Sequence, residues 1–323
     1  KISESDYNSL SKKVKPILGD IIFARYASIG AVRYVNTNIE FLPSYSCEII
    51  RMKNDVNTNF AYFVLQSPYV KNQIKLNTKT GSQPNIGKDD LSNFIIVAFP
   101  ELTEQYKVTK ILNIVTNFIT LQQRKLELLK QLKKGLLQKM FADKDSKRPI
   151  LRFSGFKGDL VNKRLEEISK IRGGFSFKSN SFKKQGIPII RISNIKNDGS
   201  VVGPFVFYTP LDEDAAFTLE GESIIIAMSG ATTGKIASIN SKQKYYQNQR
   251  VGFFEKTSCV NYDYLKYLLD TEKLRENLRK VLIAGAQPNI SGKDIDKFEF
   301  VITTEKKKKK EIAKLFGSLE DDI

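Results

Sequence analysis

The sequence predicts an α+β protein in which two mixed α/β domains are separated by a long helix. Three observations lead to this interpretation. A helical pattern runs from Glu101 to about Phe141 without proline and with Gly135 as its only glycine. Segments on either side of this stretch repeat each other at a spacing close to 204 residues. Each repeated part contains short apolar runs between polar loops, as strands and their connections do.

The long helix is predicted from apolar residues at intervals of three and four, which lie on one side of a helix. Residues 104–141 would form a rod of roughly 57 Å at 1.5 Å per residue, several times the ~11–12 residues of an average helix. We therefore predict that its apolar face pairs with another long helix. A core helix of an ordinary α domain is the alternative. The residues expected at the pairing face are Ile111, Val115, Phe118, Leu126, Leu129, Leu132 and Leu136.

The repeat divides the chain into two unequally complete copies. The segment 83–86, Gln-Pro-Asn-Ile, recurs at 287–290, and the same offset of 204 carries the alignment on to residue 323. Upstream, residues 19–22 and 59–62 align with 221–224 and 261–264 at an offset of 202. The predicted domains are 1–100 with its N-terminal part missing, the helix 101–142, a second domain 149–303, and the start of a second helix at 304–323.

Within each copy, apolar runs and breakers predict the individual elements. In the first copy we expect strands at 20–24, 49–50 and 94–99, a helix over 59–73 and a polar loop over 75–88. In the second we expect strands at 165–171, 187–195, 221–227 and 251–254 and a helix over 262–281. The lysine run 306–310 is expected to be a solvated flank of the last helix.

Composition restricts the function. The formal charge is +17 and the pI about 9.6, which favours a polyanionic partner, nucleic acid or an anionic membrane, over a merely soluble lysine-rich surface. No apolar run reaches the ~18–20 residues that span a bilayer, so the membrane alternative weakens. The two cysteines, Cys47 and Cys259, suit a reducing cytoplasm and form no zinc pattern. The absence of histidine excludes histidine-based catalysis and histidine metal ligands. We therefore expect a binding protein without a cofactor.

Several motifs in order resemble a known family. The segments 151–156, 171–179 and 186–195 are similar to the start of a target-recognition domain in the specificity (S) subunits of type I restriction–modification systems. The segments 229–235, 248–250 and 287–290 continue this likeness, and the ending 138–141 resembles the helical spacers of the family. One departure is Leu160, where the family commonly has tryptophan.

The resemblance implies a concrete role. Each of two recognition domains would read half of a split target in double-stranded DNA, and long helices paired as an antiparallel coiled coil would hold them a fixed distance apart. Methyltransferase subunits, and in restriction complexes a translocating endonuclease, would dock on the chain and supply all catalysis. The alternatives are a basic coiled-coil scaffold that binds DNA or another polyanion without sequence specificity, and a nuclease or methyltransferase, which no catalytic motif supports.

The candidate DNA-contacting residues are cations, hydroxyls and amides in loops. Arginine suits guanine and phosphate through its fork, and Asn or Gln amides can pair with adenine. The Gly-rich turn 230–235 has three residues between its glycines, and Ile236 follows its lysine, so a nucleotide-binding loop is excluded and a DNA phosphate contact or a plain turn remains. The candidates are Arg25, Arg33, Lys79, Gln83, Asn85 and Lys88 in the first copy, and Arg172, Lys178, Arg191, Thr232, Thr233, Lys235, Arg250, Gln287, Asn289 and Lys293 in the second.

Two groups of these candidates have competing interpretations. The amides of the repeated tetrapeptide are identical in both copies, whereas domains that read different bases should differ there. This favours a shared structural or phosphate role for them over base reading. Tyr45, Tyr245 and Tyr246 could stack on bases or pack in the core.

Overall fold

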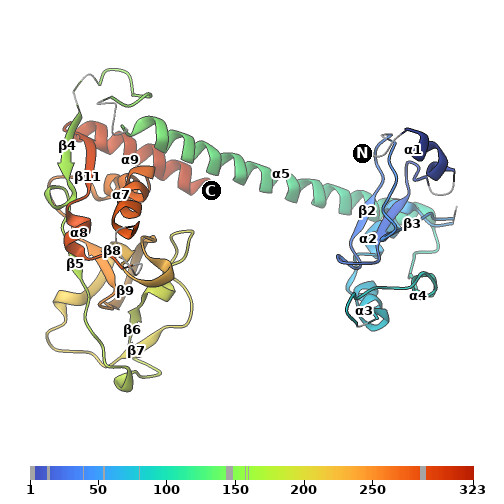
Figure 1. Cartoon of the computed structure of the whole chain (residues 1–323), viewed down its shortest axis with the longest axis horizontal. Helices are drawn as coiled ribbons and strands as arrows, with labels where there is room; N and C mark the ends of the chain where they lie inside the picture. The colour runs from blue at the N-terminus through green and yellow to red at the C-terminus, as the bar shows by residue number, and fades with distance from the viewer. Residues whose placement is uncertain are drawn as a thin grey trace. The chain divides into compact units, whose positions relative to one another are not determined.

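The protein forms two compact units, which we describe separately. The computed structural model describes residues 4–12, 15–38, 40–53, 55–79, 81–142, 148–156, 158, 160–283 and 289–323. The first unit spans residues 1–124 and the second 125–323. The predicted long helix is confirmed as α5, which runs over 39 residues from Leu102 to Met140 (Figure 1). Its N-terminal part belongs to the first unit and its C-terminal part to the second.

The first unit is built on a small antiparallel sheet in the order β2-β1-β3. Its apolar core lies between this sheet and the helices that follow it and contains Phe23, Ala61, Leu65, Val70 and Ile86. The elements are α1 (Glu4–Ser11), β1 (Ile21–Ala24), β2 (Val32–Tyr34), β3 (Cys47–Ile50), α2 (Thr58–Val64), α3 (Pro68–Asn77) and α4 (Lys88–Ser92).

Two predictions for the first unit are wrong. The helix expected over 59–73 is two helices, because Ser67 accepts a hydrogen bond from the Val70 N–H and Pro68 begins a new helix. The strand expected over 94–99 does not form a ladder with any strand of the described residues. The sheet that does form places β1 in the centre, where Ile21 and Phe23 are fully buried.

The second unit contains a six-stranded sheet in the order β5-β10-β8-β9-β6-β7, and a separate two-stranded sheet that pairs β4 with β11. All pairings in the large sheet are antiparallel except that of β6 with β9. The strands are β4 (Leu160–Arg164), β5 (Ile171–Gly173), β6 (Ile187–Ile190), β7 (Val206–Tyr208), β8 (Thr218–Ala227), β9 (Ile236–Gln247), β10 (Val251–Phe254) and β11 (Glu299–Thr303). The helices are α6 (Tyr262–Leu269), α7 (Glu272–Ile283), α8 (Gly292–Asp296) and α9 (Lys306–Asp321).

Some predicted boundaries in the second unit are also wrong. The segment 165–171, expected as one strand, is a single 3-10 turn over Leu165–Glu167 followed by the start of β5. The strand expected over 187–195 ends at Ile190, and the helix expected over 262–281 is divided at Asp270 and Thr271 into α6 and α7. The longest strand, β9, was not predicted, because many of its side chains are polar.

Helix α9 packs antiparallel to the last turns of α5. The rings of Phe141 and Phe316 lie 6.3 Å apart, and Lys133, two turns before the end of α5, pairs with Glu320 at the end of α9. Leu137 and Met140 complete the buried layer that α5 contributes to this core. Figure 1 shows α9 beside this part of α5.

The lysine run at the start of α9 differs from the prediction of a solvated flank. Lys308 is 1% exposed and Lys309 is 5% exposed. The Nζ of Lys309 donates to the carbonyl of Cys259, at 3.1 Å. Burial lowers the pKa of both lysines. The spacing of the run turns these two side chains inward with Ile312 and Phe316, because positions three and four residues apart share one helix face.

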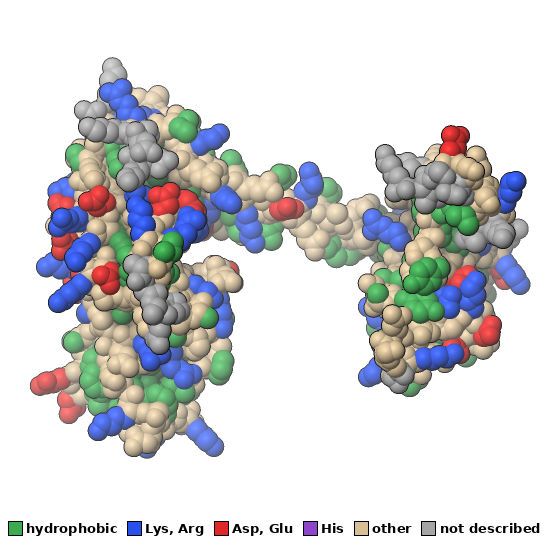
Figure 2. All heavy atoms as spheres, in the orientation of Figure 1, with side chains coloured by type: hydrophobic (Ala, Val, Ile, Leu, Met, Phe, Trp, Pro, Cys, Tyr) green, Lys and Arg blue, Asp and Glu red, His purple; other side chains and the backbone are tan. Residues whose placement is uncertain are grey.

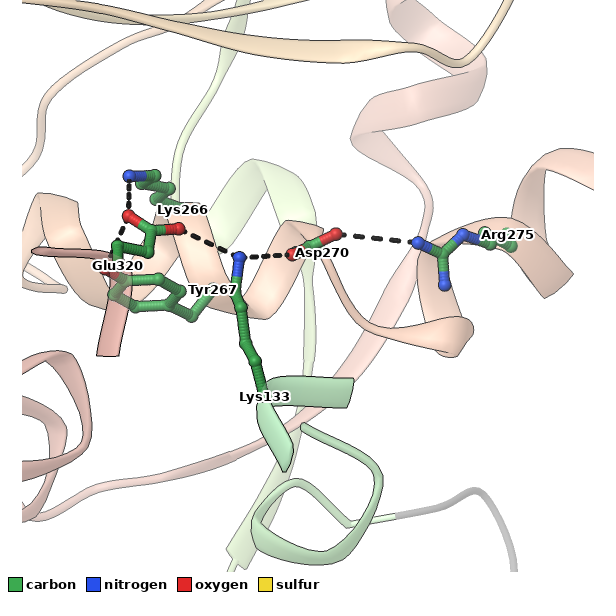
Figure 3. A network of polar contacts seen from close by, with 6 residues as sticks. All are labelled: Lys133, Lys266, Tyr267, Asp270, Arg275 and Glu320. Carbon is green, nitrogen blue, oxygen red and sulfur yellow. Dashed lines mark hydrogen bonds and ion pairs between the residues drawn. The ribbon is translucent and has the colours of Figure 1, made fainter. Parts of the chain in front are cut away.

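A network of ion pairs fastens α5 to α6 and α9 (Figure 3). The Nζ of Lys133 lies between two carboxylates, 2.9 Å from Glu320 and 3.1 Å from Asp270. Glu320 also pairs with Lys266 and accepts a hydrogen bond from the Tyr267 hydroxyl. In the second unit, a network of ion pairs therefore lies beside the apolar contacts between these helices.

The residues predicted to pair along α5 remain largely uncovered. Ile111, Phe118 and Leu132 are 62%, 60% and 50% exposed, and Val115 is 48% exposed. The other three, Leu126, Leu129 and Leu136, are half-buried. Figure 2 shows apolar side chains along the exposed part of α5.

Candidate nucleic-acid interface

The end of β1 is held by two other segments of the first unit. The N–H of Arg25, which follows β1, donates to the Ser46 carbonyl at 2.8 Å. The N–H of Ile86 donates to the Arg25 carbonyl at 3.1 Å, and Tyr26 forms a β-bridge with Asn85. Three loops from different parts of the first copy therefore converge, and we call residues 25–31, 45–46 and 85–86 the first platform.

The end of β8 has the same arrangement in the second unit. The N–H of Met228 donates to the Arg250 carbonyl at 2.9 Å, and the N–H of Ile290 donates to the Met228 carbonyl at 2.9 Å. Ser229 forms a β-bridge with Asn289. These bonds correspond one to one with those of the first platform. We call residues 228–235, 249–250 and 289–290 the second platform.

The turn within each platform closes in the same way. The N–H of Gly30 donates to the Ala24 carbonyl at 3.0 Å, and that of Gly234 donates to the Ala227 carbonyl at 2.8 Å. Both glycines have positive φ, 83° and 85°. Ala27 and Gly230, near the start of the two turns, also have positive φ, although Ala27 carries a side chain.

The platforms correct the register that the sequence predicts upstream of the tetrapeptide. The predicted offset there is 202, but the N-cap of α2 is Asn57 and the N-cap of α6 is Asn261, which are 204 residues apart. At the ends of β1 and β8, Ala24 and Ala227 occupy equivalent positions, and their offset is 203. The second turn is thus one residue longer than the first.

Substitution of Gly234 by alanine is expected to destabilise the second unit by about 1–3 kcal/mol, because a side chain would be strained at this φ. Its Cβ would also lie 2.7 Å from Cδ1 of Leu278. The control is Gly135→Ala in α5, where a Cβ meets nothing within 4 Å and should stabilise the helix by about 1 kcal/mol. Urea unfolding of the two variants measures both effects, and equal midpoints would contradict the prediction.

Most candidate residues of the first copy surround the first platform, but Arg25 is engaged in structure. Its Nε donates to the Ile86 carbonyl at 2.9 Å, and its guanidinium lies 3.4 Å from Glu48. Lys88 pairs with the same Glu48 at 3.1 Å while it stays 66% exposed. Because the Arg25 side chain links its own loop to the loop at residues 85–86, we interpret Arg25 as a structural residue of the platform.

The amides and the remaining cations of the first copy are more accessible. The side chain of Asn85 donates to the Gln83 carbonyl at 3.1 Å, which is the turn bond expected of a Pro-Asn sequence. Gln83 itself is exposed. Lys79 is 67% exposed and lies 3.4 Å from Asp90. Arg33, on the outer strand β2, is exposed.

Polar atoms in and beside the second platform are buried without a partner among the described residues. Ser229 Oγ, Thr232 Oγ1 and Arg191 Nε make no hydrogen bond to the part of the chain that the structure describes. The residue after Arg191 is Ile192. Its side chain lies 3.5 Å from the position that a Cβ of Gly230 would take, so the loop with Arg191 adjoins the loop with Ser229 and Thr232. Because unpaired buried polar atoms are costly, such a group of atoms is suited to form hydrogen bonds with a ligand, with Arg191 Nε as a donor and the two hydroxyls as donors or acceptors.

The other candidates of the second copy are placed as follows. Thr233 uses its hydroxyl to donate to the Gly230 carbonyl at 2.7 Å, and Lys235 is half-buried at the end of the turn. Exposed side chains are found at Lys178, Arg250, Asn289 and Lys293. Gln287 lies outside the described residues. Of the second tetrapeptide, the structure describes Asn289, which forms the β-bridge, and Ile290.

Arg172, a DNA-contact candidate, and Tyr246, which could stack on bases or pack in the core, make contacts within the domain. The guanidinium of Arg172 lies 4.5 Å from the centre of the Phe253 ring and donates to the Thr218 carbonyl at 2.8 Å, and burial lowers its pKa. Tyr246 is completely buried and its hydroxyl donates to Asp214 at 2.7 Å. Burial, with Asp214 beside it, raises the pKa of Tyr246. Tyr246 is therefore closed to a ligand, whereas Arg172 is half-buried and remains a candidate.

Sequence reasoning missed Tyr26, Ser229 and Gln249 as platform residues. Ser229 and Gln249 lie in segments that carry the family resemblance, but none of the three residues was among the candidates. The signal that locates them is the corrected register, which aligns Tyr26 with Ser229 and Tyr45 with Gln249.

The described residues hold no group of three or more His, Cys, Asp or Glu side chains placed to bind a metal ion. Among them there is also no helix with the length and apolar character needed to cross a bilayer. The site is therefore best described by its loops and by the side chains that they expose.

Two α/β units, each with the same loop platform and both joined to one long helix, define a modular protein with an internal duplication. The chain belongs to the family whose members carry the type I restriction modification DNA specificity domain. The family model matches residues 1–131 and 157–323.

Curated relatives agree with this family. The MjaVIII specificity subunit of a type I restriction enzyme from Methanocaldococcus jannaschii is 26% identical over 260 residues, which cover 75% of this chain and 59% of that protein. The putative MjaX specificity subunit from the same organism is 25% identical over 331 residues, which cover 94% and 76%. This chain thus spans little more than half the length of the first of these relatives.

The fold agrees as well. The crystal structure of a type I restriction–modification S subunit from M. genitalium superposes with a TM-score of 0.66 over 96% of this chain and 78% of that one, at 15% identity. At this identity the likeness concerns the fold, and it confirms the α+β class with a long helix between two sheet-containing regions.

Proposed function

We propose that this chain is a DNA sequence-specificity component of a type I restriction–modification complex and reads a bipartite target with one half-site per unit. The observation that carries the proposal is the duplicated platform: the same loop frame occurs once in each unit and exposes polar side chains at its edge. A duplicated frame of this kind suits a target made of two short, separate stretches of bases. The strongly basic composition supports DNA as the partner.

In this proposal, catalysis resides in partner subunits. Methyltransferase subunits dock on the chain, and in a restriction complex the translocating endonuclease joins them. The exposed apolar stripe of α5, including Ile111, Val115 and Phe118, supports a role in helix pairing, because such a face is otherwise unfavourable in water. The half-buried Leu136 already packs against the helix layer that α9 completes.

Selection of random DNA duplexes tests the function directly. The full chain with its methyltransferase subunits is expected to retain duplexes that share a split motif with a constant gap. Sequencing of the retained pool gives the motif, and repetition at several salt concentrations gives the number of phosphates contacted.

One alternative is distinguished by the same experiment. A basic coiled-coil scaffold would retain duplexes at low salt without any common motif, since phosphate contacts carry no sequence information. That outcome would overturn the proposed function.

A further inference from the structure

Helices α5 and α9 are attached to their units in the same way. Helix α5 begins at Leu102 and α9 at Lys306, which are 204 residues apart. The fourth residue of each helix is buried against its unit: Gln105 is fully buried and Lys309 is 5% exposed. The N–H of each donates at 3.2 Å to the carbonyl of the glutamate that precedes the helix. The duplication therefore extends to the base of each helix, and we call Gln105 and Lys309 the anchor residues.

In the first unit, the side chain of Gln105 makes three hydrogen bonds. Its Oε1 accepts from the N–H of Asn57, the N-cap of α2, at 2.8 Å. Its Nε2 donates to the carbonyl of Phe99 at 2.7 Å and to that of Asp55 at 3.5 Å. One buried side chain therefore joins the first turn of α5 to the loop from which α2 begins.

In the second unit, Lys309 takes the place of Gln105. Its Nζ donates to the carbonyl of Cys259 at 3.1 Å. Cys259 lies two residues before the N-cap of α6, as Asp55 lies two residues before the N-cap of α2. The ammonium of one copy thus makes the contact that an amide makes in the other. Because two different side chains form the same contact, the geometry that this contact imposes, and not one residue type, is what the two copies share.

The direction of a long helix depends strongly on how its base is held. Helix α5 has 39 residues and is about 58 Å long at 1.5 Å per residue. A tilt of about 10° at its first turn would displace its other end by about 10 Å, the length of roughly three base pairs of DNA. Buried hydrogen bonds at the first turn oppose such a tilt, because it would leave their donors and acceptors unpaired.

We infer that Gln105 and Lys309 are positioning residues that fix the directions of α5 and α9 at their units, and with them the number of base pairs between the half-sites. This inference rests on the proposed function. In the second unit the effect reaches α5 through α9, which packs on the last turns of α5 and pairs Glu320 with Lys133 at 2.9 Å. The side-chain hydrogen bonds of the anchor residues end outside both platforms, so the bases of each half-site should not depend on them.

Removal of the hydrogen bonds at each anchor residue tests the inference. Gln105→Met and Lys309→Met keep an unbranched side chain but remove its N–H donors. Each full chain, with its methyltransferase subunits, is used to select random duplexes beside the wild type, and the retained sequences are sorted by gap length. We expect the preference for the wild-type gap over gaps one base pair longer or shorter to fall roughly tenfold, the effect of about one lost hydrogen bond. Both half-site motifs should stay the same.

A conservative exchange separates the hydrogen bond from the identity of the residue. Lys309→Gln gives the second unit the amide that the first unit uses, and this amide can still donate to the Cys259 carbonyl. The variant is therefore expected to keep the wild-type gap, whereas Lys309→Met loses the preference for it. Matched controls are Gln123→Met in α5 and Lys310→Met in α9, which replace exposed side chains of the same helices and should leave the gap and both half-sites unchanged.

Thermal unfolding shows which variants are folded. If Gln105→Met does not fold, the two Lys309 variants still test the inference in the second unit. A folded Met variant of either anchor residue that keeps the wild-type gap preference overturns the inference and leaves the proposed function intact. So does Lys309→Gln if it loses this preference as fully as Lys309→Met. A wild-type pool without a motif instead overturns the proposed function.

Discussion

Replacement of residues 149–303 by the equivalent stretch of another family member is expected to change one half-site completely and to leave the other half-site and the gap unchanged. The structure explains why this stretch can be exchanged. Its first strand, β4, pairs with its last strand, β11, with Leu160 opposite Thr303 and Arg164 opposite Glu299. The exchanged stretch therefore carries both strands of this sheet, and the pairing between them moves with it. The gap should stay constant because α5, which joins the units, is not altered.

The exchanged stretch must keep the apolar layer that it shares with the helices. Leu137 of α5, Phe141 directly after this helix and Phe316 of α9 pack in one core with Tyr264 and Leu265 of the stretch. A donor with comparable volumes at the last two positions should preserve this core, since volume-conserving changes cost the least. Thermal unfolding of the chimera therefore serves as its folding control.

The measurement is the duplex selection already described, carried out with the chimera and the parent chains. A chimera that acquires the donor's half-site in place of one parental half supports one half-site per unit. If both half-sites changed, or neither, the assignment of one half-site to residues 149–303 would be wrong.

Local sequence pattern was sufficient for elements whose side chains repeat at regular intervals. The apolar residues along α5 recur every three or four positions, and the helix, predicted over 101–142, is present from Leu102 to Met140. Strands β1 and β10 are short apolar runs and were also predicted. These elements are determined by burial of one face, which sequence periodicity reports directly.

Features that depend on distant contacts could not be obtained in the same way. The 12 residues of β9 include Asn240, Lys242 and Gln243, and they form a strand because β8 pairs with them. Lys308 and Lys309 are buried because α9 docks on α6 and α5, although a lysine run alone indicates solvent. Tertiary contacts override local preference in each of these cases.

In the candidate site, too, some features follow from the local sequence and others depend on contacts between distant residues. Composition and the repeated tetrapeptide were enough to direct attention to Asn85, Asn289 and the glycine turn. The platform itself depends on hydrogen bonds between residues about 20 and 60 positions apart, such as those that Arg25 makes with Ser46 and Ile86. The sequence alignment upstream of the tetrapeptide used an offset of 202, whereas the structure aligns Tyr45 with Gln249 at 204, so the sequence did not show their equivalence.

Substitution of Glu320 by glutamine is expected to destabilise the second unit by about 2 kcal/mol at neutral pH. Glu320 is about a quarter exposed and pairs with Lys133 and Lys266. The value lies between those of exposed pairs, about 0–1 kcal/mol, and of fully buried pairs, about 3–5 kcal/mol. The substitution leaves Lys133 with Asp270 as its remaining carboxylate and deprives the Tyr267 hydroxyl of a charged acceptor. The control is Glu272→Gln, because Glu272 pairs with exposed arginines on α7 and should contribute less than about 0.5 kcal/mol.

The pH dependence of unfolding gives a second, independent readout for Glu320. Burial acts to raise the pKa of Glu320, but hydrogen bonds from Lys133 and Lys266 hold it below its ordinary value of 4.5. A carboxyl whose folded pKa is depressed stabilises the protein above its unfolded pKa, and this stabilisation disappears as the pH falls through the folded value. The difference in unfolding free energy between the wild type and Glu320→Gln should therefore be constant at neutral pH and shrink below about pH 4.5. If that difference persisted into strong acid, or were already absent at neutral pH, the ion-pair network would not be what fastens α9 to α5.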